Sequence, residues 1–118
     1  MSKVYVVQKP LRSVKDAHGE VVDLVPLFNL APAMEYGDIV TLLDPGDVSA
    51  FPDQVTSILL DRMKHFGDDD YILPTGDTAL VAIAGAVAAK YNDGAFKVLK
   101  WDRATRTYTE LQYNIGVI

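Results

Sequence analysis

Residues 70 to 101 read DYILPTGDTALVAIAGAVAAKYNDGAFKVLKW, and this stretch decides the fold. A short apolar segment is followed by a turn at Thr75, Gly76 and Asp77, an alanine-rich run at residues 78 to 91 and a second apolar segment. This order predicts strand, turn, helix and strand, because parallel strands need a crossover connection that is usually a helix. We therefore expect a βαβ unit whose turn lies beyond the carboxyl end of its first strand, where ligands often bind in open α/β sheets.

The N-terminal part of the chain predicts a β-hairpin. Residues 3 to 8 and residues 20 to 30 are both apolar and rich in β-branched side chains, and a turn sequence that ends in Gly19 lies between them. Gly19 can adopt the left-handed conformation that closes such a hairpin. Pro26 has no amide proton for the ladder, so the second arm is expected at a sheet edge, or bent or interrupted at that residue.

The remaining segments complete the predicted fold. They are a helical turn at 31 to 37, a strand at 39 to 43, an amphipathic helix at 52 to 66, and a C-terminal hairpin with arms at 96 to 101 and 108 to 115. In the last arm Leu111, Tyr113 and Ile115 alternate with polar residues, which predicts one buried and one wetter face. We predict an α/β fold of the mixed α+β kind, with a single mixed sheet, N-terminal and C-terminal hairpins, one βαβ unit and two main helices. These elements form one compact domain that covers residues 1 to 118.

The alanine-rich helix at residues 78 to 91 has almost no polar face. A helix that is apolar all round has to be covered on more than one side. Two arrangements meet this requirement: the sheet and the first helix cover it within the chain, or a partner chain covers part of it. Small side chains around Gly85 would allow a neighbour to approach closely in either arrangement. The second arrangement leads us to expect a homo-oligomer.

The amino-acid composition and the charge restrict the functions that this protein can have. The 118 residues are 49% hydrophobic, include no cysteine and carry a net charge of −5. Absence of cysteine fits a reducing compartment, and we find neither a signal-peptide pattern nor an apolar run of about 20 residues. We expect a cytoplasmic protein that is neither secreted nor membrane-spanning. Eleven acidic and three basic side chains lie between residues 31 and 94, which disfavours nucleic acid as a partner. This acidic surface suits a basic partner, or it simply keeps the domain soluble.

Thr75, Gly76 and Asp77 form the first candidate site. Thr75 or Asp77 could cap the helix by accepting hydrogen bonds from its first amides, and the same amides could bind a phosphate or carboxylate. Asp77 competes with such an anion for the positive end of the helix, although it could bind a ribose hydroxyl or an amine instead. The turn has one glycine and therefore matches neither the dinucleotide fingerprint nor a Walker loop. Helix capping and a small-molecule site both remain open.

The other chemistry-bearing residues predict neither a metal site nor a catalytic centre. Asp68, Asp69 and Asp70 cannot converge on one ion, because consecutive residues of an extended segment point in alternating directions. We interpret them as a solvated acidic loop. His18 and His65 have no second His or Cys at metal-ligand spacing. We expect no metal, no cofactor and no enzymatic activity.

The second candidate site lies in the C-terminal hairpin, which Trp101, Arg103, Arg106, Tyr108 and Tyr113 make both aromatic and basic. Three interpretations fit this mixture. The aromatic residues could belong to the core, they could form a protein interface, where Trp, Tyr and Arg dominate the binding energy, or they could form a platform for single-stranded nucleic acid. Because the rest of the chain is acidic, we favour the protein interface over nucleic acid, and we favour core aromatic residues over both.

Three segments resemble small uncharacterised proteins encoded by tailed bacteriophages: YILPTGD at residues 71 to 77, the alanine-rich helix, and KVLKWDR at residues 97 to 103. The resemblance covers mainly residues 68 to 115. It implies expression inside an infected bacterium. Small phage accessory proteins of this kind often act by binding a host protein or by capturing a small molecule, rather than by catalysis. The resemblance assigns no functional residue.

The leading hypothesis is a non-enzymatic binding protein of the host cytoplasm, a phage accessory protein that binds or inhibits a host protein through the C-terminal hairpin. The alternative is a small-molecule or nucleotide-binding protein that uses the turn at Thr75, Gly76 and Asp77. A flat turn capped by Asp77 would favour the first hypothesis. A pocket at the turn, lined by aromatic and polar side chains, would favour the second.

Overall fold

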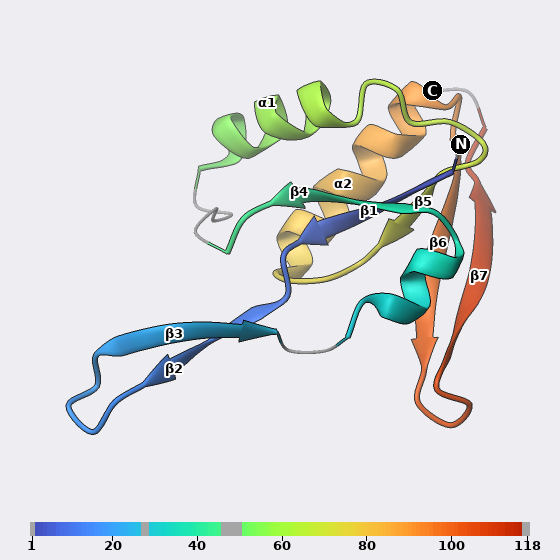
Figure 1. Ribbon diagram of the computed structural model, residues 1–118. Helices are drawn as coiled ribbons and strands as arrows, with labels where there is room; N and C mark the ends of the chain where they lie inside the picture. The colour runs from blue at the N-terminus through green and yellow to red at the C-terminus, as the bar shows by residue number, and fades with distance from the viewer. Residues whose placement is uncertain (1, 27–28, 46–50, 117–118) are drawn as a thin grey trace.

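The computed structural model describes residues 2–26, 29–45 and 51–116, which form a main sheet, a small separate hairpin and two α-helices (Figure 1). The elements in chain order are β1 (Lys3–Gln8), β2 (Leu11–Lys15), β3 (Val21–Pro26), the 3-10 helix η1 (Ala31–Glu35), β4 (Asp38–Leu43), α1 (Pro52–Arg62), β5 (Tyr71–Leu73), α2 (Thr78–Tyr91), β6 (Ala95–Asp102) and β7 (Thr107–Asn114). The mixed α+β fold with two main helices agrees with the prediction from the sequence.

The main sheet has the strand order β4-β1-β5-β6-β7. β1 pairs in parallel with β4 and with β5, β5 pairs in parallel with β6, and β7 returns antiparallel to β6. The chain runs from β1 outward to β4 and then passes back over β1 to build β5 and β6 on the other side. The direction of winding therefore reverses between β1 and β5, and the carboxyl ends of these strands form a topological switch point.

The predicted βαβ unit is confirmed as β5, α2 and β6, with Tyr71 beside Lys97 and Ile72 beside Val98. The turn between β5 and α2 follows the carboxyl end of β5. It therefore lies at the switch point.

The N-terminal hairpin is present, but its predicted first arm is wrong. β2 pairs with β3, whereas β1 lies inside the main sheet. The physical reason is burial: the four residues from Val4 to Val7 are at most 2% exposed, and a strand buried on both faces belongs in the middle of a parallel sheet. The hairpin forms its own two-stranded sheet, and Pro26 ends β3 opposite Leu11. The Asp16 carboxylate accepts from the amide of His18 in the connecting turn.

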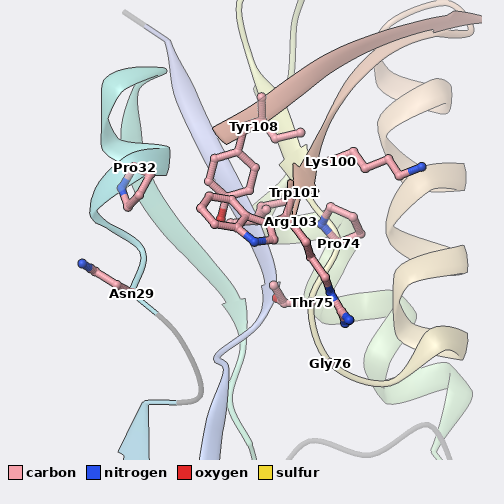
Figure 2. A pocket seen from close by; sticks show the side chains of 11 residues that line it. Asn29, Pro32, Pro74, Thr75, Gly76, Lys100, Trp101, Arg103 and Tyr108 are labelled. Atoms are coloured by element: carbon pink, nitrogen blue, oxygen red, sulfur yellow. The ribbon is translucent and has the colours of Figure 1, made fainter. Parts of the chain in front are cut away.

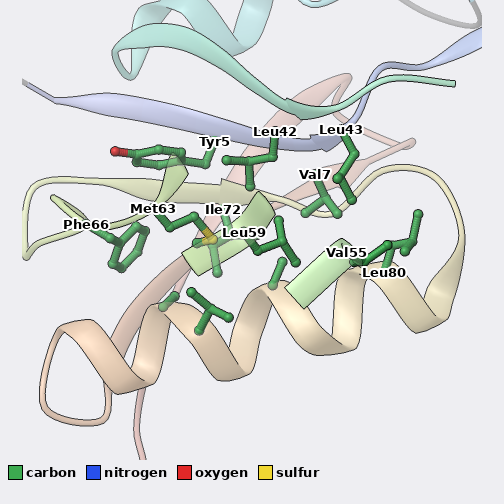
Figure 3. Close-up of a cluster of buried hydrophobic side chains, with 13 residues drawn as sticks. Tyr5, Val7, Leu42, Leu43, Val55, Leu59, Met63, Phe66, Ile72 and Leu80 are labelled. Atoms are coloured by element: carbon green, nitrogen blue, oxygen red, sulfur yellow. The ribbon is translucent and has the colours of Figure 1, made fainter. Parts of the chain in front are cut away.

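The two faces of the main sheet are covered unequally. α1 and α2 pack on one face and form the larger hydrophobic cluster with side chains of β1, β4 and β5 (Figure 3). The opposite face carries a smaller cluster, in which Ala33 of η1 packs with Val6, Leu73, Leu99 and Tyr108. A five-residue 3-10 helix covers much less of a sheet than two α-helices, so part of this face stays open.

One face of α2 is covered by the sheet and α1, whereas Ala79, Ala82 and Ala86 on its other side are exposed. Ala84, Val87 and Ala88 are at most 4% exposed and belong to the cluster between the sheet and α1. The Tyr91 hydroxyl donates to the Leu60 carbonyl of α1 at 2.7 Å. α2 therefore does not need a partner chain to bury its main apolar face.

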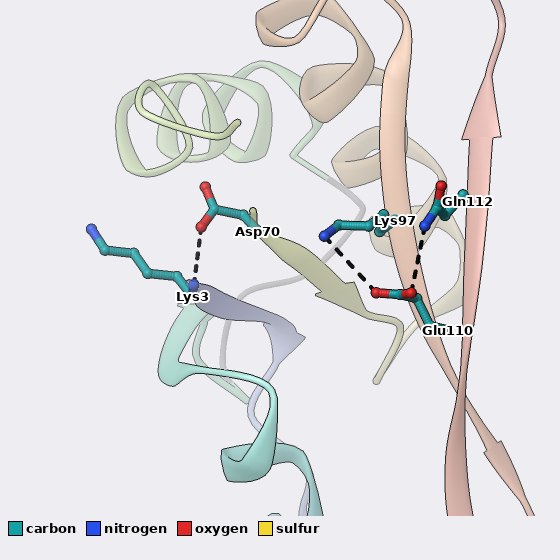
Figure 4. Close-up of polar contacts among 5 residues, drawn as sticks. All are labelled: Lys3, Asp70, Lys97, Glu110 and Gln112. Atoms are coloured by element: carbon teal, nitrogen blue, oxygen red, sulfur yellow. Dashed lines mark hydrogen bonds and ion pairs between the residues drawn. The ribbon is translucent and has the colours of Figure 1, made fainter. Parts of the chain in front are cut away.

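Two local predictions need correction. α1 ends at Arg62 rather than near residue 66, because Met63 leaves helical geometry, although Phe66 remains buried. Asp70 is not solvated: it is 7% exposed, and its carboxylate accepts from the Lys3 amide at 2.9 Å (Figure 4) and from the Gly67 amide at 2.9 Å. These hydrogen bonds tie the start of β1 to the start of β5.

The predicted burial of the last strand is also wrong. Tyr113 and Ile115 are 49% and 65% exposed, and Leu111 is half-buried, whereas Tyr108 on the opposite face is buried. β7 lies at the edge of the sheet, and α2 packs mainly against α1, β1 and β6 rather than against β7. Among the described segments, no helix is long and apolar enough to cross a membrane.

Candidate functional site

The switch point is closed by hydrogen bonds between the last residue of β1 and the turn after β5. The Thr75 hydroxyl donates to the Gln8 carbonyl at 2.7 Å, and the Gln8 amide donates to the same hydroxyl oxygen at 3.3 Å. Thr75 is 7% exposed. Its hydroxyl thus holds two strands together and fixes the turn.

Gly76 and Asp77 extend this connection into α2. Gly76 has φ +90°, and a Cβ at this position would lie 2.5 Å from the Cβ of Gln8. The Asp77 amide donates to Gln8 Oε1 at 3.1 Å, and the Asp77 carboxylate accepts from the Ala79 amide at 2.8 Å as the N-cap of α2. Two amides at this helix end therefore already have acceptors within the chain, which leaves little capacity there for a bound anion.

A pocket of about 590 Å³ opens beside this turn, on the sheet face opposite the α-helices (Figure 2). Leu73, the last residue of β5, and Leu99 of β6 line it and are at most 3% exposed. The turn contributes Pro74, Thr75 and Gly76, the C-terminal hairpin contributes Trp101, Arg103 and Tyr108, and Pro32 of η1 lies opposite. This volume lies within the range of small-molecule pockets, about 300 to 1,000 Å³.

The two candidate sites predicted from the sequence therefore meet in one pocket. Thr75 and Gly76 come from the first, and Trp101, Arg103 and Tyr108 come from the second. They meet because β5 and β6 are neighbouring parallel strands, whose carboxyl ends lie at the same edge of the sheet.

The remaining candidates lie outside this pocket. Asp77 turns toward its own helix as the N-cap. Arg106 lies in the tip of the hairpin and lines a neighbouring hollow of about 450 Å³. Tyr113 lies on the helical face of the sheet and packs on Phe96, with ring centroids 5.6 Å apart.

The aromatic wall of the pocket is held in a defined geometry. Trp101 and Tyr108 are directly opposite each other on β6 and β7, with ring centroids 5.0 Å apart and an interplanar angle of 66°. Tyr36, which follows η1, donates from its hydroxyl to the Tyr108 carbonyl at 3.1 Å. Trp101 remains 40% exposed although Tyr108 is buried. The indole ring of Trp101 is therefore partly exposed to solvent, and it packs against Tyr108, whose position is fixed by Tyr36.

Charge around the pocket comes from the hairpin. Arg103 extends toward the pocket, while the side chain of Lys100 points to the other side, toward α2 (Figure 2). Arg103 therefore adds one positive charge at the rim of a largely apolar site. Sequence reasoning missed Pro32, Leu73 and Leu99, because an apolar side chain gives no local sign that it lines a pocket.

A polar cluster lies on the same face, further along β5, β6 and β7 (Figure 4). The Lys97 ammonium lies 3.9 Å from the Glu110 carboxylate and 4.2 Å from the centroid of the Tyr71 ring. A hydrogen bond with Glu110, followed by burial, raises the pKa of Tyr71 to about 12. The same hydrogen bond lowers the pKa of Glu110. Among the described residues, no group of three or more His, Cys, Asp or Glu side chains could hold a metal ion.

Comparisons with known proteins place the chain in a phage family. No curated protein and no solved structure matches it. The family model described as Phage Pam3 gp32-like protein matches residues 2–115, which is nearly the whole chain. This match confirms the resemblance to bacteriophage proteins and extends it to the N-terminal hairpin and β1. The chain belongs to the Phage Pam3 gp32-like protein family.

Proposed function

We propose that this phage protein acts as an accessory protein in the host cytoplasm by binding a host protein without catalysing a reaction, and that the pocket beside Trp101 accepts an apolar side chain of that partner. The observation that carries the proposal is the partly exposed indole, which is fixed by Tyr108 above an apolar pocket. Interface energy concentrates in such Trp, Tyr and Arg anchors at the mouths of well-packed pockets.

The chemistry of the pocket specifies what it could accept. Leu73, Leu99 and Pro32 offer an apolar base and wall, which favours a leucine, methionine or aromatic side chain. Arg103 at the rim can form a bidentate pair with a carboxylate. The preferred partner segment therefore has an apolar residue next to Asp or Glu.

The polar groups of the pocket support binding rather than catalysis. The Thr75 hydroxyl is committed to the Gln8 backbone, so it is poorly placed to act as a nucleophile. The Lys100 side chain points away from the pocket (Figure 2). The Tyr108 ring packs between Trp101 and Tyr36, and burial raises the pKa of its phenol.

The proposal is tested by comparing the tagged protein with its Trp101→Ala variant in pull-downs from host lysate, followed by titration of any candidate with the purified proteins. Tyr113→Ala is the matched control, because Tyr113 is an exposed aromatic residue on the opposite face of the same hairpin. A hot-spot tryptophan predicts affinity about thirtyfold weaker for Trp101→Ala and little change for Tyr113→Ala. Equal binding by wild type and Trp101→Ala would refute the proposed role of the pocket.

A small-molecule function is the second candidate, and the place of the pocket favours it. The pocket opens at the switch point between β1 and β5, where open α/β sheets commonly bind ligands, and the turn at Thr75 and Gly76 lines it. Trp101 is the single tryptophan, so its fluorescence reports on the pocket alone. Titration with nucleotides and with aromatic carboxylates should change this emission if the candidate is right, and an unchanged emission together with native mass spectra free of bound ligand would exclude these classes.

A further inference from the structure

Each edge of the main sheet has one main-chain acceptor that a side chain of the fold occupies. At the β4 edge, the Arg62 guanidinium of α1 donates to the Leu42 carbonyl and thereby occupies one of the main-chain acceptors. At the other edge, the Tyr36 hydroxyl occupies the Tyr108 carbonyl near the start of β7. β7 pairs with β6 over eight residues without a bulge, and within the described part of the chain no strand pairs with its outer side. β7 reads TYTELQYN and contains no lysine or proline, the residues that commonly prevent edge-to-edge pairing.

β7 also exposes apolar side chains that the fold leaves uncovered. Leu111 is half-buried and Tyr113 is 49% exposed on the helical face of the sheet. Pairing with a further strand would bring a neighbouring side chain directly against Leu111.

The hydrogen-bond pattern shows which main-chain groups of β7 point outward. The Ile115 amide donates to the Gly94 carbonyl at 2.9 Å, in the same register that pairs Ala95 with Asn114. Main-chain groups alternate along an antiparallel ladder, so odd-numbered residues of β7 bond to β6 and even-numbered residues point away from it. Glu110 and Gln112 therefore present amides and carbonyls at the open edge.

We propose that β7 pairs antiparallel with β7 of a second copy of this chain, with the two-fold axis passing through Leu111. A two-fold axis perpendicular to the sheet keeps equivalent faces on the same side, so one residue of β7 must lie opposite its own copy. An axis at Glu110 would place two carboxylates opposite each other, which is unfavourable. An axis at Leu111 pairs the two leucines and places Glu110 opposite Gln112 of the partner subunit. The Gln112 side-chain amide, which donates to Glu110 of its own chain at 3.5 Å, can then donate to the facing carboxylate instead.

This pairing satisfies the open edge. The outward groups of Glu110, Gln112 and Asn114 and the Tyr108 amide find partners, which adds about six main-chain hydrogen bonds across the two-fold axis. The Tyr108 carbonyl keeps its hydrogen bond from the Tyr36 hydroxyl. The two sheets become one continuous sheet, and both Trp101 pockets lie on the same face of the dimer. Of the residues that line the pocket, only Tyr108 takes part in the dimer contact, and it does so through its main chain, so the proposal does not depend on the function proposed above.

The experiment combines a mass measurement with cysteine cross-linking. Light scattering and sedimentation over about a hundredfold range of concentration should show a dimer for the wild type. Leu111→Lys places like charges opposite each other and should give a monomer, whereas Val22→Lys is the control, because Val22 is 61% exposed on the separate hairpin. Circular dichroism checks that both variants are folded.

Cross-linking tests the register even if Leu111→Lys fails to fold. The chain has no cysteine, so each introduced thiol is the only one. In the proposed register the two Leu111 residues form a close, non-hydrogen-bonded pair with Cα atoms about 4.5 Å apart, a separation that a disulfide can bridge. Leu111→Cys should form a covalent dimer on mild oxidation, and Gln112→Cys should form far less. A wild type that stays monomeric throughout, or faster cross-linking of Gln112→Cys, would overturn the proposal.

Discussion

Replacing Thr75 with valine tests whether its hydroxyl holds the switch point together. The substitution keeps the branched shape but removes the donor to the Gln8 carbonyl, at 2.7 Å, and the acceptor for the Gln8 amide, at 3.3 Å. Both contacts join segments that are 67 residues apart in the chain. Their loss should therefore loosen tertiary structure rather than a local turn.

The expected cost follows from burial. Thr75 is 7% exposed, so water cannot readily replace the lost hydroxyl. One good hydrogen bond contributes about 1 kcal/mol net, and leaving a buried donor or acceptor without its partner costs about 1 to 3 kcal/mol. We expect Thr75→Val to lower the free energy of unfolding by about 2 kcal/mol. For a domain of this size, that corresponds to a fall in Tm of roughly 8 °C.

Urea denaturation, followed by circular dichroism and by Trp101 fluorescence, measures this change. Thr75→Ser is the matched control, because it keeps the hydroxyl and loses one methyl group, for which we expect a cost of about 1 kcal/mol or less. The two probes should report one transition with the same midpoint in each variant. A Thr75→Val protein as stable as Thr75→Ser would show that the hydroxyl does not hold β1 to the turn.

Three further predictions concern neighbouring contacts. Asp70→Asn should lower the free energy of unfolding by about 2 kcal/mol in a denaturation experiment, because an amide nitrogen would face one of the two backbone amides that the buried carboxylate now accepts; an unchanged midpoint would contradict this. Gly76→Ala should cost about 2 kcal/mol, since φ is +90° and the new Cβ would push against Gln8, and a stabilised protein would refute this reasoning. The pKa of Tyr71 is raised from 10.0 to about 12, so the stability it contributes should be complete below pH 10 and disappear as the pH rises toward 12. An ultraviolet titration of wild type against Tyr71→Phe checks this, and loss of a component that titrates near pH 10 would count against it.

The local sequence pattern was sufficient to predict the βαβ unit. The segment from Tyr71 to Leu73, the turn at Thr75 and the alanine-rich helix have distinct periodicities, and all three form as predicted. Capping of α2 by Asp77 was also one of the two interpretations, because an aspartate directly before a helix has a local hydrogen-bonding role.

The position of β1 could not be derived from turn chemistry. Gly19 correctly marks a hairpin turn, but a turn does not determine which upstream segment pairs across it, and the segment from Leu11 to Lys15 is the one that does. A useful signal was nevertheless present in β1. Val4 to Val7 form an apolar run without alternation, which is typical of a strand buried on both faces of a parallel sheet.

The pocket was only partly predictable for a related reason. Trp101 and Thr75 follow neighbouring parallel strands, so the βαβ prediction already places them at the same edge of the sheet. Pro32 reaches the pocket from a segment about 40 residues earlier, and its position depends on how η1 packs against Tyr108 and β7. No periodicity in the sequence encodes that contact.

The unequal covering of the sheet explains why the pocket exists at all. Two α-helices fill one face, whereas η1 supplies the other face with a single short turn of helix, and the ends of β5 and β6 remain open beyond it. The open area does not collapse, because Thr75 is hydrogen-bonded to Gln8 on one side and Trp101 packs against Tyr108 on the other. A ligand or partner side chain would thus enter a site whose walls are already ordered, so little of the binding free energy would be lost in ordering them.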